Sequence, residues 1–238
     1  MLLYFIRHGD PIYVPDSLTP LGHRQAEAVG RRLALHGLDA VYSSPSNRAR
    51  LTAQPTCEIL KLEPTILPFC DEGVVYQSFC VPDGNGSTMW CFYDGPTRDK
   101  MNSPEVRALG DDWYTHPYFA DNRFTEGVLT MRTAVDDFLA SLGFRHDRHA
   151  HHYTVEAKND QRIAIFAHQG AGLSFLSSIL DIPYNVFCMH FDISHTGISV
   201  VEFPTHGDIC VPRLLQHSGD GHLYHENLGT RYNNSLPI

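Results

Sequence analysis

The stretch LLYFIRHGD, residues 2–10, decides the fold of this chain. It opens with a short apolar run, which is typical of a strand buried on both faces of a parallel sheet. Arg7 and His8 follow that run at once, so they stand at the carboxyl end of the predicted strand. In open α/β sheets, ligands bind beyond the carboxyl ends of the strands. The sequence therefore predicts a functional site that begins with these two side chains.

Strands and helices alternate along most of the chain. Thr19-Pro20 has the form of a helix N-cap followed by a proline at the first helical position, and this helix is predicted to run to about His36. A second helix begins near Asn47, where Pro55 is expected to kink or end it. Further strands are predicted at 39–43, 65–67, 163–167, 197–203 and 209–215, and further helices at 128–142 and 172–180. This alternation predicts an α/β fold, a three-layer α/β/α sandwich with a mostly parallel central sheet.

Two segments differ in composition from this pattern. Residues 70–127 hold both tryptophans and ten of the 26 aromatic residues, with a glycine and asparagine cluster at 83–86. Because linkers lack aromatic residues, we expect an inserted cap or lid within one domain that spans residues 1–238. Residues 144–161 are polar and rich in histidine. Their histidines lack the spacing of a zinc site and predict a solvated turn rather than a metal site: His146, His149, His151 and His152.

Charge and cysteine content exclude several function classes. The chain of 238 residues carries 18 basic and 27 acidic residues, a formal charge of −9. Such a balance disfavours a nucleic-acid partner or an anionic membrane surface, but it allows an anionic substrate in a local basic pocket. The six cysteines form no C-x-x-C pair, and no basic residue precedes the short apolar run at the N-terminus. We therefore expect reduced thiols, neither a signal peptide nor a spanning segment, and a cytoplasmic location. The oligomeric state stays open.

Two more polar segments stand at predicted strand ends. Residues 44–48, Ser-Pro-Ser-Asn-Arg, lie at a strand-to-helix turn, and residues 167–170, Ala-His-Gln-Gly, end the strand at 163–167. Together with Arg7 and His8, they bring two arginines and two histidines to one edge of the sheet. Planar guanidinium groups suit phosphate oxygens, and a helix N-terminus favours an anion. This edge is therefore a candidate phosphate site.

Four motifs in this order, FIRHGD, LTPLGHRQA, SSPSNRARLTA and FAHQG, resemble those of the histidine phosphatase superfamily, which has the phosphoglycerate-mutase-like fold. The resemblance covers residues 1–61 and about 162–203. It implies that His8 is the nucleophile, which attacks phosphorus in line to give a phosphohistidine. It also implies that Arg7, Arg48 and His168 hold the equatorial oxygens of the phosphoryl group. No metal and no cofactor is expected.

In this superfamily the general acid is often a glutamate soon after the third strand. Glu72 occupies that place, and Asp71 beside it is the alternative. Asp10 follows the RHG motif where relatives commonly carry Glu, Gln or Thr, and it either contacts the substrate or caps its loop. Gln169 follows the second histidine where relatives usually have Gly, so its side chain changes the floor of the pocket. His195 either lines the site or is a structural histidine.

The predicted function is hydrolysis of a small phosphomonoester without metal. The alternatives are a phosphoglycerate mutase that uses the same chemistry and a catalytically silent module that binds phosphorylated ligands. Segment 70–127 holds four basic against ten acidic residues, which disfavours a highly charged substrate and favours a monophosphate with an apolar or aromatic part. A pure binding module has no need of a nucleophile, so His8 favours an enzyme.

Overall fold

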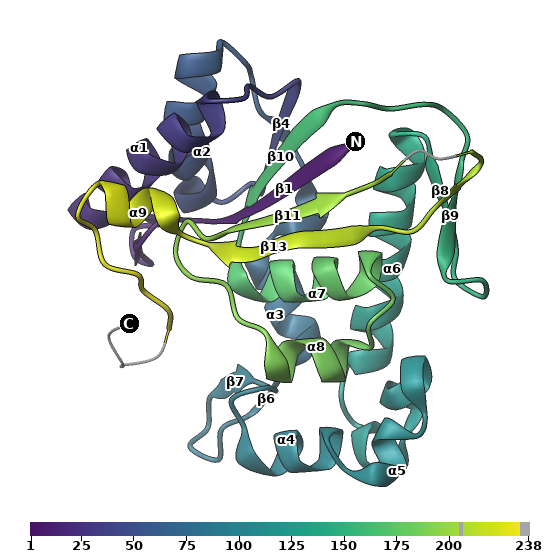
Figure 1. Ribbon diagram of the computed structural model, residues 1–238. Helices are drawn as coiled ribbons and strands as arrows, with labels where there is room; N and C mark the ends of the chain where they lie inside the picture. The colour runs from purple at the N-terminus through teal and green to yellow at the C-terminus, as the bar shows by residue number, and fades with distance from the viewer. Residues whose placement is uncertain (205–206, 234–238) are drawn as a thin grey trace.

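The computed structural model describes residues 1–204 and 207–233. Its centre is a six-stranded sheet in the order β13-β11-β1-β10-β4-β5 (Figure 1). Four strands are parallel: β1 (Leu2–Arg7), β10 (Arg162–Ala167), β4 (Ala40–Ser43) and β5 (Thr65–Ile66). The other two lie at one edge: β11 (Ile198–Glu202) pairs antiparallel with β1, and β13 (Arg213–Gly219) pairs antiparallel with β11. The mostly parallel α/β sheet predicted from the sequence is confirmed.

The register of the two central strands positions the candidate site. Arg7 at the end of β1 lies opposite Ala167 at the end of β10. The chain continues this pairing by one residue, since the amide of His8 donates to the carbonyl of Ala167 at 2.9 Å. The histidines that follow the two strands, His8 and His168, therefore leave the same edge of the sheet side by side.

Helices cover both faces of the sheet (Figure 1). One face carries α1 (Pro20–Ala34) and α2 (Asn47–Leu60), with the short α9 (Gly221–His225) packed on α1. The other face carries α7 (Gln169–Ile179), which packs against α3 (Glu72–Phe79), α6 (Phe124–Ser141) and α8 (Tyr184–His190). Side chains alternate across a strand, so Ile6 belongs to the core under α1 while Phe5 packs against Phe175 of α7. No helix within residues 1–204 and 207–233 is long and apolar enough to cross a membrane. The cytoplasmic location stays a prediction.

Helix α2 excludes one of the two alternatives for Pro55. The helix runs through Pro55 to Leu60, so the proline does not end it. A β-carbon at Gly30 of α1 would lie only 3.2 Å from the Cβ of Pro55, so the two helices pack closely at this point. Packing of an amphipathic face supplies most helix stability in proteins. Here it outweighs the backbone hydrogen bond that the proline cannot make.

The segment 70–127 folds as a series of short elements at the end of the molecule opposite α1 and α2 (Figure 1). They are α3, the hairpin of β6 (Cys80–Pro82) and β7 (Thr88–Trp90), α4 (Gly95–Met101), α5 (Pro104–Arg107), η2 (Gly110–Thr115) and η3 (Pro117–Phe119), with η1 (Pro68–Cys70) just before them. The buried Trp113 packs on Phe124 at 5.3 Å and on Tyr184 at 6.4 Å between ring centroids. Its aromatic residues thus join the main core through α6 and α8. Helix α6 begins at Phe124, before the expected Val128.

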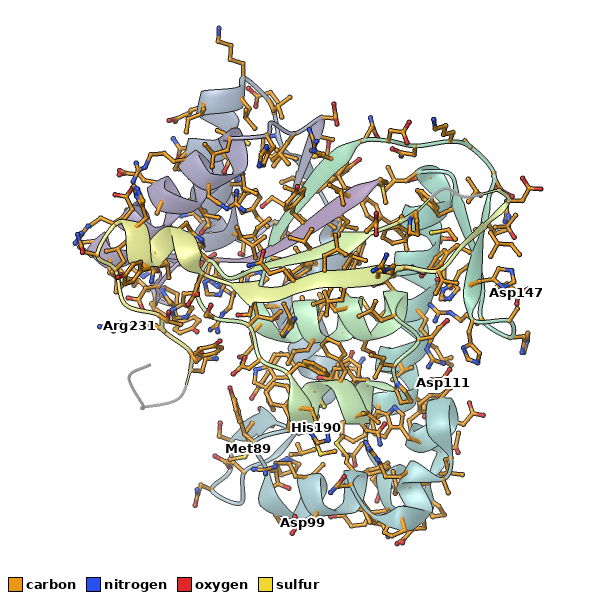
Figure 2. All side chains as sticks on the ribbon, in the orientation of Figure 1. Met89, Asp99, Asp111, Asp147, His190 and Arg231 are labelled. Atoms are coloured by element: carbon orange, nitrogen blue, oxygen red, sulfur yellow. The ribbon has the colours of Figure 1, made fainter. Side chains whose placement is uncertain are left out.

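The histidine-rich segment is the predicted solvated turn only at residues 148–151, which include the exposed His149 and His151. It forms a hairpin of β8 (Phe144–Asp147) and β9 (His152–Val155), and β12 (Ile209–Cys210) adds a third strand. The single strand expected at 209–215 is therefore two strands in two different sheets. Phe144 and Tyr153 are fully buried against Phe203, and these inward positions decide the fold of the hairpin. Asp147 lies at its outer end (Figure 2).

One histidine of this hairpin is a buried ionic centre. The side chain of His146 is fully buried, with Nδ1 2.9 Å from Asp136 and Nε2 3.0 Å from Asp181. Arg148 binds Asp136 at 2.8 Å, and the ring of Tyr153 stacks on His146 at 4.0 Å. In the part of the chain that the structure describes, no group of three or more His, Cys, Asp or Glu side chains has the arrangement of a metal site.

His146 makes the stability of the fold depend on pH. Burial lowers its pKa, but the bonds to Asp136 and Asp181 outweigh burial and hold the pKa above its ordinary value. The stabilisation is therefore complete below about pH 6.5, the unfolded pKa, and is lost as pH rises through the folded pKa. We expect His146→Gln to lower the free energy of unfolding by about 3 kcal/mol at pH 5.5 and by less at pH 8.5.

Urea denaturation at the two pH values measures this effect. His149→Gln is the control, because His149 is an exposed side chain on the same hairpin. It should cost little at either pH. A loss for His146→Gln that does not change with pH would show that the buried histidine is neutral.

Candidate active site

Three buried histidines meet at the carboxyl ends of β1 and β10. The ring centroid of His168 lies 5.1 Å from that of His8, edge to face. On another side of His8, the ring of His195 lies 5.8 Å away and nearly parallel. Each of the three residues is at most 5% exposed. Two of them follow the strands that the sequence identifies, whereas His195 comes from the turn before β11.

The tautomer of His8 follows from its hydrogen bond. Its Nδ1 lies 2.7 Å from the carbonyl oxygen of Gly9, which only accepts, so Nδ1 carries the proton and Nε2 keeps its lone pair. Burial, reinforced by His168 and by the charge of Arg7, holds the pKa of His8 well below its usual range. The imidazole is therefore neutral, which is the form a nucleophile needs. Gly9 allows α1 to pack closely against this turn, since a β-carbon at Gly9 would lie only 2.6 Å from the carbonyl oxygen of Gly22.

His168 has partners at both ring nitrogens. Its Nδ1 accepts from a guanidinium nitrogen of Arg48 at 3.1 Å, because arginine can only donate. Its Nε2 therefore carries the proton and donates to Ser44 Oγ at 2.8 Å. Burial, and next the charge of Arg48, holds the pKa of His168 well below its usual range. His168 is a neutral group that fixes the end of Arg48.

Arg48 lies in the first turn of α2, as expected from the SSPSNRA motif. Its other terminal nitrogen bonds Asp16 at 2.8 Å, and its guanidinium lies 5.5 Å from the ring centroid of Tyr13. Asp16 and Tyr13 belong to the hairpin of β2 (Pro11–Ile12) and β3 (Ser17–Leu18), which folds over this side of the site. Neither residue was identified from the sequence, because nothing in a loop composition says which side chain turns inward.

Arg7 is 1% exposed and is held by three acceptors. Nη1 donates to the carbonyl of Ile193 at 2.6 Å, and Nη2 donates to His195 Nε2 at 2.9 Å and to Asn233 Oδ1. The Nε atoms of Arg7 and Arg48 are both buried and have no hydrogen-bond partner within residues 1–204 and 207–233. Leaving a buried charged donor unpaired is costly, and an anion between the two guanidinium groups would satisfy both.

The two candidate acids separate clearly. Asp71 is the N-cap of α3, where its Oδ1 accepts from the amide of Gly73 at 2.8 Å. Glu72 instead reaches the first turn of α7, and its two oxygens accept from the amides of Gly170 and Ala171 at 3.0 and 2.9 Å. Burial raises the pKa of Glu72, although these amides and both site arginines act to lower it. Of the two alternatives, Glu72 is the carboxyl that lies with the site.

Asp10 is turned toward protein groups. Its Oδ2 accepts from Thr19 Oγ1 at 2.7 Å, and its Oδ1 lies 3.5 Å from His195 Nδ1. The first contact is the loop-capping role that the sequence left open. The second links Asp10, through His195, to Arg7.

The side chain of Gln169 forms hydrogen bonds with residues that are far apart in the sequence. Its amide nitrogen donates to Tyr93 Oη at 3.2 Å and to the carboxylate of Asp192, and its amide oxygen accepts from Asn233 at 2.7 Å. Figure 2 shows the neighbouring Arg231 on the C-terminal segment that carries Asn233. Asp192 and Asn233 carry no motif, and only the folded chain brings them to the end of β1.

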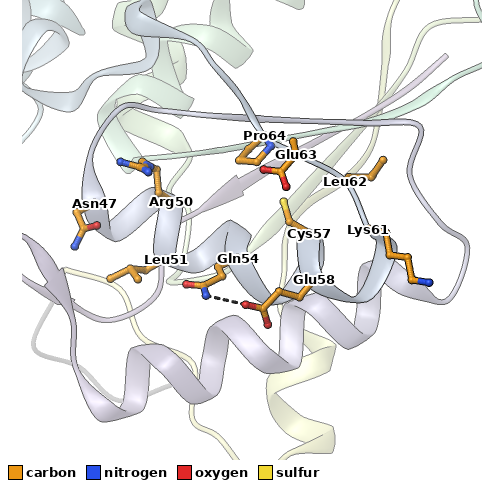
Figure 3. A pocket seen from close by; sticks show the side chains of 10 residues that line it. All are labelled: Asn47, Arg50, Leu51, Gln54, Cys57, Glu58, Lys61, Leu62, Glu63 and Pro64. Carbon is orange, nitrogen blue, oxygen red and sulfur yellow. Dashed lines mark hydrogen bonds between the residues drawn. The ribbon is translucent and has the colours of Figure 1, made fainter.

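A cavity of about 520 Å³ elsewhere on the surface does not belong to this site. It lies along α2 and is lined there by Arg50, Gln54 and Glu58 and beyond the helix by Lys61 and Glu63 (Figure 3). Its basic and acidic side chains offset each other, and the histidines of the site are not among its walls.

Comparison with protein families gives one match. Residues 3–73 match the model of the histidine phosphatase superfamily (branch 1). No curated protein matches the chain.

Solved structures match over nearly the whole chain. Phosphoserine phosphatase from Entamoeba histolytica in complex with 3-phosphoglyceric acid is 19% identical with a TM-score of 0.58, over 93% of this chain and 98% of that one. A mutant of that enzyme in complex with phosphoserine has a TM-score of 0.61 at 19% identity, over 93% and 98%. Mycobacterial glucosyl-3-phosphoglycerate phosphatase has a TM-score of 0.58 at 19% identity, over 91% and 98%. At these identities the likeness shows a shared fold, which confirms the phosphoglycerate-mutase-like architecture.

Proposed function

We propose that this chain, a member of the histidine phosphatase superfamily, hydrolyses a small phosphomonoester through a phosphohistidine intermediate on His8. The family match of residues 3–73 and the fold of the solved phosphatases support the enzyme class. One observation carries the chemistry. The buried Arg7 and the partly exposed Arg48 both have buried Nε donors that are unpaired among the described residues, beside a neutral His8 whose Nδ1 proton is fixed.

In the first step, the phosphate dianion binds between Arg7 and Arg48. His8 Nε2 attacks phosphorus in line, a P–N bond forms, and the bond from phosphorus to the ester oxygen breaks. The guanidinium groups stabilise the charge on the equatorial oxygens. Glu72, whose pKa is raised by burial, gives its proton to the leaving oxygen, so the alcohol departs neutral.

In the second step, water attacks the phosphohistidine. The carboxylate of Glu72 takes a proton from that water, the P–N bond breaks, and inorganic phosphate leaves. His8 returns to its neutral form with Nδ1 bonded to Gly9. The proton on Glu72 is restored, so the cycle closes with no metal and no cofactor.

A cavity next to Gln169 supports a substrate whose alcohol has an apolar or aromatic part. This cavity of about 290 Å³ has aromatic and aliphatic walls, such as Phe92, Tyr93 and Leu173, together with polar ones from Arg98 and Asp192. Apolar walls with convergent polar groups are typical of small-molecule sites. A small phosphate ester is therefore the proposed partner, and the absence of nucleic-acid and membrane partners stays a prediction.

The mutase alternative requires a site that holds two phosphoryl groups. Carboxylates lie near the two guanidinium groups instead: Asp16 bonds Arg48 directly, Asp10 reaches Arg7 only through His195, and Asp192 reaches it only through Gln169 and Asn233. A second phosphoryl group would meet these negative charges, which favours a phosphatase. The silent-module alternative leaves the neutral, oriented His8 without a role.

The test is phosphate release from a panel of phosphate esters, with and without EDTA. We expect release from p-nitrophenyl phosphate and from aromatic and small alkyl monophosphates, at rates that EDTA leaves unchanged, because the two arginines supply the positive charge. Inhibition by EDTA that Mg²⁺ or Zn²⁺ reverses would contradict the metal-free mechanism. Transfer of the phosphoryl group to a second hydroxyl, without phosphate release, would favour the mutase.

A further inference from the structure

The surroundings of Arg7 are unusual for a buried arginine. Buried charges are normally paired with an opposite charge. Arg7 instead has three neutral acceptors: the carbonyl of Ile193, the imidazole of His195 and the side-chain amide of Asn233. Within residues 1–204 and 207–233, no carboxylate lies within salt-bridge distance of its guanidinium. Arg48 differs, since Asp16 contacts it directly.

Of the two side chains that accept from Arg7, Asn233 is exposed and His195 is buried. Its Nε2 accepts from Arg7, so the ring proton is on Nδ1, which faces Asp10 Oδ1 at 3.5 Å. Burial, and next the charge of Arg7, lowers the pKa of His195 to about 3, so the ring stays neutral near pH 7. Its backbone amide donates to the carbonyl of Arg231 at 2.8 Å, and its ring stacks beside His8. The imidazole is thus held by its bond to Arg7 and by the ring of His8, while its buried Nδ1 makes no hydrogen bond within residues 1–204 and 207–233.

We propose that His195 is a positioning residue, which orients the guanidinium of Arg7 through a neutral acceptor and so leaves its charge for the phosphoryl group. The inference rests on the proposed function. A hydrogen bond to a neutral nitrogen fixes direction without cancelling charge, whereas a carboxylate at the same distance would cancel most of it. Asp10 accepts a hydrogen bond from Thr19 and lies 3.5 Å from Nδ1 of His195. It is therefore separated from the guanidinium of Arg7 by the imidazole ring.

The test compares two variants of equal size. In His195→Gln the amide oxygen reaches toward Arg7 as a neutral acceptor, and in His195→Glu a carboxylate of the same length does so. The readouts are the inhibition constant of vanadate, which imitates the in-line transition state, the binding constant of inorganic phosphate by calorimetry, and the thermal midpoint. We expect His195→Gln to bind vanadate within about fivefold of the unmodified protein, and His195→Glu to bind it more than about tenfold more weakly.

Stability separates positioning from a structural role. The new carboxylate pairs with Arg7, so the thermal midpoint of His195→Glu should be no lower than that of His195→Gln while its anion affinity falls. His222→Gln is the control: it removes another buried histidine nearby, bonded to Thr196, and should leave vanadate affinity unchanged.

Two outcomes overturn different statements. Equal vanadate constants for the Gln and Glu variants, in a protein that hydrolyses phosphate esters, would overturn the role of His195 and leave the phosphatase intact. An unmodified protein that hydrolyses none of the esters would overturn the proposed function, whatever its phosphate affinity.

Discussion

His8→Ala should abolish turnover, with kcat/KM at least about a thousandfold lower, because the covalent route through a phosphohistidine then has no nucleophile. The fold should survive. Within residues 1–204 and 207–233, the side chain of His8 makes one hydrogen bond, to the neighbouring Gly9 carbonyl, so its loss leaves no distant partner there unpaired. Arg7 and Arg48 stay in place, and calorimetry should still detect binding of inorganic phosphate.

Rapid quenching with labelled substrate checks the intermediate. In the unmodified protein, the label should appear on His8 as an acid-labile, base-stable phosphoryl group, and it should be missing from His8→Ala. His222→Gln, a buried histidine outside the site, serves as the matched control and should keep both label and turnover. Full activity in His8→Ala would contradict the covalent mechanism.

Glu72→Gln should lose more activity on substrates whose leaving group must be protonated than on substrates whose leaving group is stable as an anion. For alkyl phosphates we expect a loss on the order of a hundredfold. For p-nitrophenyl phosphate the loss in the first step should be much smaller, because that phenolate is already stable. The amide of glutamine keeps one acceptor for the Gly170 and Ala171 amides, so the geometry of α7 is largely retained.

Asp71→Asn is the matched control for this experiment. It changes the neighbouring carboxylate, which caps α3 and does not reach α7. Asparagine is itself a good N-cap, so stability and both rates should change little. If Asp71→Asn shows the leaving-group dependence and Glu72→Gln does not, the general acid is Asp71. No dependence in either variant would place the acid elsewhere in segment 70–127.

The sequence identified the parts of the site that lie next to a strand end. His8 and His168 each follow an apolar run directly, and the parallel register of β1 and β10 then brings them together. Arg48 could be identified in the same way, because it lies in the first turn of the helix that follows strand β4. In all three cases the information is local, and the general geometry of a parallel sheet supplies the rest.

The remaining features depend on contacts that no local pattern records. Asn233 reaches Arg7 from 226 positions away, and His195 becomes a partner of Arg7 only after β11 has paired with β1. The helix through Pro55 is stabilised by its neighbour, and the hairpin at 144–155 by three aromatic side chains. The cap boundary at 70–127 stays a prediction, since its aromatic residues pack into the main core.

The position of β1 also has a consequence for how the chain reaches its folded state. The first strand pairs on one side with residues 162–167 and on the other with residues 198–202. During vectorial synthesis β1 therefore leaves the ribosome long before either neighbour exists, and the backbone N–H and C=O groups on both of its edges stay unpaired until they arrive. Long-range strand pairing is slow to form and exposes unpaired edges meanwhile. The proposed nucleophile is thus among the first residues made, and its surroundings are among the last to assemble.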